Sequence, residues 1–167
     1  MVVACLATVG LVSACGSSSS SSAATHSPSS TTHFAKTKFL LHSVLAFGAF
    51  HSYIYEPFRA GEFKHPFLHK LTLIKAAVAA LFVEHELRLA ATDAKSSKIL
   101  RTLFAPLTAV ADKISSLKDS IKGGSVSSPD MSGLQSQLSS ISKTASSKGQ
   151  SIQNLIPSAG QLASGVG

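Results

Sequence analysis

Apolar residues recur every three or four positions along most of this chain, and this spacing constrains the fold more than any other feature. The clearest run has successive spacings of 4, 4, 3, 4, 3 and 4 and consists of Ile99, Leu103, Leu107, Val110, Ile114, Leu117 and Ile121. Apolar side chains at this period lie on one face of an α-helix. No stretch alternates with the two-residue period of a half-buried strand. The pattern therefore predicts helices and no sheet.

Three further segments show the same period. The first runs from Phe34 to Tyr55, with the stripe Leu40, Val44, Phe47, His51 and Ile54. The second is expected to begin near Pro66, because proline suits the first turn of a helix, and its stripe is Phe67, Leu71, Ile74, Val78, Leu81 and His85. The last opens at Ser128-Pro129 and continues to Leu155, with Met131, Leu134, Leu138, Ile141 and Ala145 on its apolar face.

Turn and cap residues separate these segments. Gly61 and Gly123-Gly124 mark breaks, Thr92 or Asp93 would cap the third helix, and Pro106 is expected to kink it. Four amphipathic helices with short connections predict an all-α fold, an antiparallel helical bundle over residues 34–156. Residues 157–167 are expected to form a disordered tail.

The N-terminal segment has a different character. Residues 1–14 are apolar and end in small residues, which is typical of a signal peptide, and they are too short to span a bilayer, which needs about 20 residues. Cys15 follows, and after Gly16 come six consecutive serines. Residues 15–33 cannot bury a core, so they are predicted to form a disordered, flexible tether.

The segment Val12-Ser13-Ala14-Cys15 resembles the lipobox of bacterial lipoproteins, in which an aliphatic residue and two small residues precede a cysteine. The resemblance covers only about the first twenty-two residues, and the body resembles no family. It implies removal of the signal peptide at residues 1–14, lipidation of Cys15, and a lipid anchor at the extracytoplasmic face of the cell membrane. The apolar leader lacks the Lys or Arg expected before it, which indicates that the true start codon lies upstream of Met1.

Charge excludes one class of partner. The net charge is +7, from 15 Lys and Arg against 8 Asp and Glu. The cations are spread singly along the expected helices, without a dense run or an aromatic platform, so no nucleic acid is expected as a partner. Mild attraction to anionic lipid or to other acidic polymers of the envelope is the simpler expectation.

Histidines are the candidate metal ligands of the body. His65 and His69 are four positions apart, a spacing at which two imidazoles can share a metal, and antiparallel pairing of the first two helices would bring His51 to their level. A metal or haem site at these three residues is the alternative to a protein without a cofactor. A lone histidine on an apolar stripe, such as His51, is more often a hydrogen-bonded core residue.

A second cluster is expected at the other end of the same helix pair. There His42 would approach His85, which Glu84 and Glu86 flank. The two glutamates point to different helix faces and do not form a paired-carboxylate site, and Glu84 is expected to pair with Arg88 one turn later.

Two features of the first helix leave alternatives open. Its 17 residues from Phe39 to Tyr55 carry no Lys, Arg, Asp or Glu, so a membrane-embedded helix is the weaker alternative to a central bundle helix. The aromatic turn that follows, residues 53–63, either closes the end of the bundle or forms an exposed binding patch.

No catalytic motif is present. The chain has no Gly-x-Ser-x-Gly, no His-Glu-x-x-His and no phosphate-binding glycine loop. The sequence therefore predicts no catalytic residue and no enzyme, but a membrane-anchored helical module of the cell envelope. Such a module would bind an envelope protein, or a second copy of itself, through a helical face.

Overall fold

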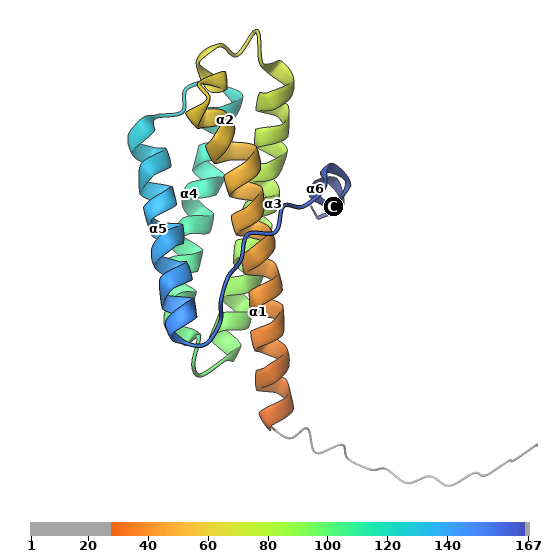
Figure 1. Ribbon diagram of the computed structural model, residues 1–167, viewed down its shortest axis with the longest axis vertical. Coiled ribbons are helices and arrows are strands. Elements are labelled where there is room, and N and C mark those ends of the chain that lie inside the picture. Colours follow the sequence, from red (N-terminus) through yellow and green to blue (C-terminus); the bar gives the residue numbers. More distant parts are fainter. Residues whose placement is uncertain (1–27, 166–167) are drawn as a thin grey trace, which may run out of the picture.

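The computed structural model describes residues 28–165, which are mostly helical and include no strand. Four long helices run up and down beside one another (Figure 1): α1 (Pro28–Phe50), α3 (Lys70–Ser96), α4 (Phe104–Lys122) and α5 (Ser128–Ser147). The prediction of an all-α helical bundle is confirmed. The predicted signal peptide, Cys15 and the tether up to residue 27 lie outside the described residues. Of the helices within residues 28–165, none combines the length and apolarity needed to cross a membrane.

The first helix is longer than predicted. α1 begins at Pro28 and not at Phe34, since the fixed backbone angle of proline suits the first turn of a helix. Residues 28–33, which were assigned to the tether, are therefore helical. A π-helical turn (His51–Tyr55) continues α1 without a break into α2 (Glu56–Arg59).

The aromatic residues after α1 close one end of the bundle. Phe63, in the 3-10 turn Glu62–Lys64, is buried, and its ring meets that of Phe58 edge-on at 6.1 Å between centroids. Tyr53 and Tyr55 pack partly against the same core. These side chains fold inward, so they do not form the exposed patch that was the alternative.

α3 buries a different face from the one predicted. Phe67, Leu71 and Ile74, from the predicted core stripe, are exposed, and Pro66 lies in the turn before the helix. The face that is buried consists mainly of small residues: Leu73, Ala76, Ala77, Ala79, Ala80, Val83, Leu87, Ala90, Ala91 and Ala94. Small side chains let neighbouring backbones approach closely, and both α1 and α4 pack on α3. The predicted orientation of this helix was wrong.

Most of the near-heptad run forms the seam of α4 as predicted, with Leu107, Val110, Ala111, Ile114, Leu117 and Ile121 buried. Ile99, the first residue of the predicted run, is instead 43% exposed in the connection before α4. The helix does not extend back to residue 92, however, because α3 continues to Ser96 and a turn separates the two helices. Pro106 therefore lies in the first turn of α4, where its missing N–H costs nothing, and produces no kink. The predicted pair of Glu84 and Arg88 is present at 3.0 Å, and Arg88 also reaches Asp112 of α4 at 3.0 Å.

α5 starts where the sequence predicted and ends earlier. The backbone N–H of Asp130 donates to the hydroxyl of Ser127, which caps the helix. The helix stops at Ser147 because the chain turns at Gly149, whose φ of 77° favours glycine. The predicted continuation to Leu155 was wrong.

The C-terminal segment is ordered and crosses the bundle. Residues 150–158, here called the strap, run over α1 and lead to a short helix, α6 (Ala159–Ser164), beside α3 (Figure 1). The hydroxyl of Tyr53 donates to the carbonyl oxygen of Pro157 at 2.8 Å. Leu162 of α6 is buried. The prediction of a disordered tail from residue 157 was therefore wrong for α6. This helix begins with a capping box formed by Ser158 and Gln161.

Candidate functional site

The three histidines predicted as metal ligands do not converge. His51 Nδ1 lies 3.4 Å from Glu56 Oε1, and His69 Nδ1 lies 3.8 Å from Glu62 Oε2. His65 is exposed in the connection before α3. Within residues 28–165, no three His, Cys, Asp or Glu side chains are grouped so that they could hold a metal ion.

His42 joins a buried carboxylate cluster between α1 and α3. Its Nδ1 donates to Oε2 of Glu86 at 2.6 Å, and its Nε2 lies 3.8 Å from Oδ2 of Asp93. Burial raises the pKa of the Asp93 carboxyl above its ordinary value, and the positive charges of His42 and Lys38 oppose that shift. His85, the expected neighbour of His42, is exposed instead. The cluster satisfies a buried glutamate and ties two helices together, which is a structural role.

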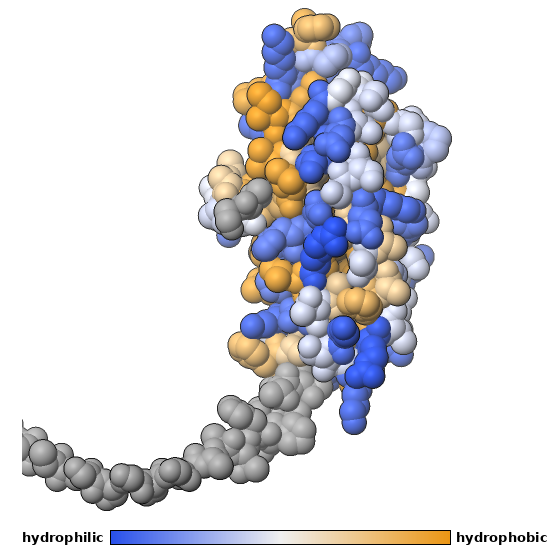
Figure 2. Space-filling model, turned by 180° about the vertical axis from the view of Figure 1, so that it is seen from behind, coloured by the Kyte–Doolittle hydropathy of each residue, from blue (hydrophilic) through white to orange (hydrophobic). Residues whose placement is uncertain are grey.

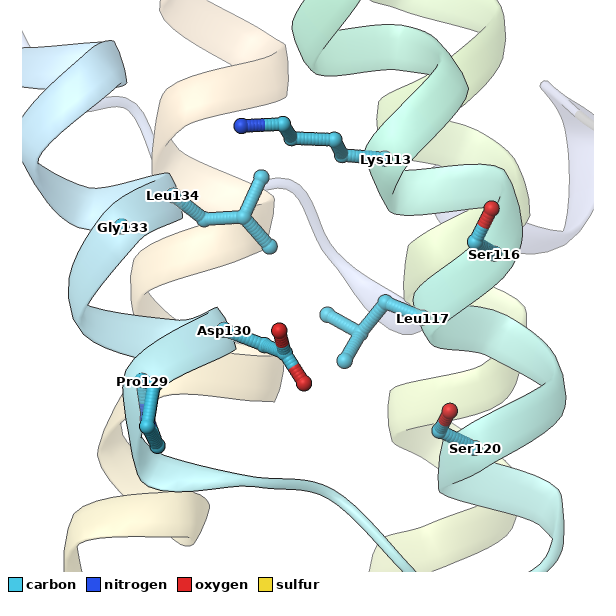
Figure 3. A pocket seen from close by; sticks show the side chains of 8 residues that line it. All are labelled: Lys113, Ser116, Leu117, Ser120, Pro129, Asp130, Gly133 and Leu134. Carbon is cyan, nitrogen blue, oxygen red and sulfur yellow. The ribbon is translucent and has the colours of Figure 1, made fainter.

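A narrow groove of about 290 Å³ lies between α4 and α5 (Figure 3). The side chain of Lys113 extends from α4 across the groove, and the carboxylate of Asp130 points toward Leu117. Asp130 also accepts the hydroxyl of Ser127, so it belongs to the cap of α5. Ser116 donates to its own helix, to the carbonyl oxygen of Asp112. Asp130 and Ser116 are thus engaged in local structure, and the groove contains no nucleophile paired with a base.

An extensive apolar surface lies along the outer face of α3. Here a groove of about 710 Å³ is lined by Pro66, Phe67, Lys70, Leu73, Ile74, Ala77, Val78, Leu81, Lys122 and Gly123. Of this lining, Phe67 is 84% exposed and Ile74 61%, and Leu68 and Leu71, which are not part of the lining, are 80% and 65% exposed. Apolar surface gathers on this side of the molecule in Figure 2. Contiguous exposed apolar patches on a folded protein mark interaction sites. We call this surface the α3 groove.

The neighbouring stretch of α3 already holds a helix of the same chain. Leu162 of α6 is 3% exposed, and a Cβ placed on Gly165 would lie 2.6 Å from the ring of Phe82 on α3. The outer face of α3 therefore accepts a short helix through close apolar contact. The α3 groove continues along this face, with Val78 and Leu81 in its lining.

Sequence reasoning missed the α3 groove because it assigned the same stripe to the core. A signal was present, since the alanines at 76, 77, 79 and 80 make the opposite face of the helix apolar as well. A helix that is apolar on both faces has either two buried sides or one side left for a partner.

Comparison of the chain with models of protein families, with curated proteins and with solved structures gives no match.

Proposed function

We propose that this chain is a lipid-anchored, non-catalytic binding module of the bacterial cell envelope, which takes the apolar face of a partner helix in the α3 groove. The observation that carries the binding role is the groove itself, whose lining includes Phe67 and Ile74, each more than half exposed, on the side of α3 away from its buried alanines. The Val12-Ser13-Ala14-Cys15 segment supports the lipid anchor.

The shape and chemistry of the α3 groove favour a helix as its occupant. Apolar side chains follow the axis of α3 from Phe67 to Leu81, a length that suits side chains at positions i, i+3, i+4 and i+7 of a second helix. Lys70 and Lys122 are the cations of the lining. A partner helix with carboxylates beside its apolar stripe would complement both the shape and the charge of this surface.

The anchor is tested by intact mass. Protein from the native membrane fraction should begin at Cys15 and be heavier by a diacylglycerol group, and the Cys15→Ser variant should be neither cleaved before residue 15 nor lipidated. An unmodified full-length protein that fractionates with the cytosol would refute the anchor.

The binding role is tested by cross-linking in intact cells. A photo-reactive amino acid at Phe67, an exposed residue of the groove lining, should capture one protein of defined mass, while the same probe at Ala109, an exposed position on α4, should not. Adding Ile74→Glu to the Phe67 probe should abolish the product, because a carboxylate would be buried without a partner. Equal capture at both probe positions would show that the α3 groove has no special role.

A further inference from the structure

The two ends of the bundle differ in which segments form them. At one end, called here the entry end, lie the first turns of α1, the connection between α3 and α4 (residues 97–103) and the last turn of α5 (Figure 1). The chain enters the described domain here at Pro28, so the predicted anchor at Cys15 precedes this end. The opposite end contains the connection between α2 and α3, where the α3 groove begins.

Most of the net charge lies at the entry end. Six cations are placed there, namely Lys36, Lys38, Lys95, Lys98, Arg101 and Lys148. Asp93 is the carboxylate of this end, and its side chain is only 18% exposed. The rest of the chain has nine cations and seven carboxylates, from totals of 15 and 8. Residues 1–27 contain no Lys, Arg, Asp or Glu and leave this balance unchanged.

Large apolar side chains are exposed among these cations. Phe34 is 64% exposed, Ile99 43% and Phe104 37%. The ammonium of Lys38 lies 4.6 Å from the ring centroid of Phe34, and that of Lys95 lies 5.4 Å from the ring centroid of Phe104. Each exposed aromatic ring thus has a lysine beside it.

We infer that the entry end docks on an anionic lipid bilayer, with its cations among the phosphates and Phe34, Ile99 and Phe104 in the headgroup region. Cations attract both a bilayer and a soluble polyanion, but exposed apolar side chains gain only from the apolar layer of a bilayer. The inference rests on the proposed function, since the lipid on Cys15 would hold this end at the membrane. Docking of the entry end would also orient the domain so that the α3 groove lies away from the lipid.

The charge contribution is tested by partitioning onto vesicles. The full chain with Cys15→Ser, which cannot be acylated, is mixed with vesicles of equal parts phosphatidylglycerol and phosphatidylcholine, or of phosphatidylcholine alone. Each cation near an anionic surface strengthens binding about fivefold, so Lys98→Ala with Arg101→Ala should weaken binding about 25-fold. The control, Lys64→Ala with Lys75→Ala, removes two exposed cations from the other end and should change binding less than about threefold. Equal weakening by the two variants would overturn the inference.

The apolar contribution is tested by fluorescence. The chain contains no tryptophan, so Ile99→Trp and Leu68→Trp each introduce a single reporter, one at each end. Anionic vesicles should shift the emission of the residue 99 reporter to shorter wavelength and protect it from aqueous quenchers, while the residue 68 reporter should not change. Both variants carry the same N-terminal segment, so any affinity of that segment for lipid is common to the two measurements.

Two outcomes distinguish bilayer docking from polyanion binding and from the lipid anchor. If long-chain polyphosphate competes with vesicles while the residue 99 reporter never shifts, the entry end binds soluble polyanions and the inference is wrong. Because Cys15→Ser removes the acyl group from every sample, the vesicle result does not depend on whether Cys15 is lipidated. Failure of the anchor would appear only in the intact-mass experiment.

Discussion

Gly48 allows the strap to lie directly against α1, and replacing it with alanine should separate the two. An ideal Cβ at residue 48 would lie 1.9 Å from the carbonyl oxygen of Leu155 and 2.4 Å from its carbonyl carbon. Both are backbone atoms, so no side-chain rotation can relieve the overlap. The strap must therefore move away from α1 in the Gly48→Ala variant.

The cost follows from what the strap contributes. Displacement breaks the hydrogen bond from Tyr53 to Pro157 and the weaker one from the N–H of Leu155 to the carbonyl of Val44, together worth about 1 to 2 kcal/mol. Exposing Ile152 and Pro157, which pack against the bundle, adds about 2 kcal/mol. Alanine is a better helix former than glycine by about 1 kcal/mol, which offsets part of this loss. The net destabilisation is about 2 to 3 kcal/mol.

Urea unfolding followed by circular dichroism measures this change, and Gly133→Ala is the matched control. Gly133 lies within α5, and a Cβ there has no atom within 4 Å, so only the helix propensity should act, with a gain of up to about 1 kcal/mol. The two glycine-to-alanine changes should therefore have opposite signs. If Gly48→Ala stabilises the protein as much as Gly133→Ala does, the strap does not pass over residue 48.

Three other predictions concern residues of α3 and of α1, which packs on it. Ala80→Leu should lower the free energy of unfolding by about 1 to 3 kcal/mol, because residue 80 is fully buried. Ile74→Ala, on the exposed face of α3, should change it by less than about 0.5 kcal/mol, and thermal unfolding of the two variants measures the difference. His42→Ala should cost about 2 to 3 kcal/mol at pH 7 by leaving the buried Glu86 without its donor, and His42→Gln should recover part of that loss in urea unfolding. Because the pKa of the Asp93 carboxyl is raised in the folded protein, ionisation of this carboxyl opposes folding. The stability that protonated Asp93 contributes is therefore lost as the pH rises from 3.8, the ordinary pKa of the group, through its pKa in the folded protein. Asp93→Asn should therefore be more stable than the parent at pH 7 and equal to it at pH 3, and a constant difference between these pH values would contradict the assigned cause.

The sequence predicted the helices better than their orientations. The seam from Leu107 to Ile121 was assigned correctly because α4 has only one apolar face. α3 has two, and hydrophobic spacing cannot decide which one is buried. The other face carries larger side chains and more apolar area. The alanine face is nevertheless the buried one, because its small side chains let α1 and α4 approach α3 closely.

Local signals explain most of the other differences. The capping box of Ser158 and Gln161 was present in the sequence, but six residues are too few to form a stable helix without tertiary contacts such as those of Leu162. The α3 groove also depends on tertiary packing, since several side chains that appear as a core stripe in the sequence line this groove once the alanine face of α3 is buried. The pairing of His42 with Glu86 required the register of two helices, which spacing along one chain does not specify.

The strap also determines the order in which this fold can be completed. Tyr53 and Pro157 are 104 residues apart, and their contact closes a loop that contains three of the four long helices, α3, α4 and α5. Closing so long a loop is entropically costly until the intervening helices have packed, so the strap docks last. Once folded, it should open at a lower free energy than the bundle, as a separate unit in hydrogen exchange. When it opens and carries α6 with it, the apolar face of α3 is uncovered along a greater length, so the local opening equilibrium sets how much of that surface is accessible to the proposed partner helix.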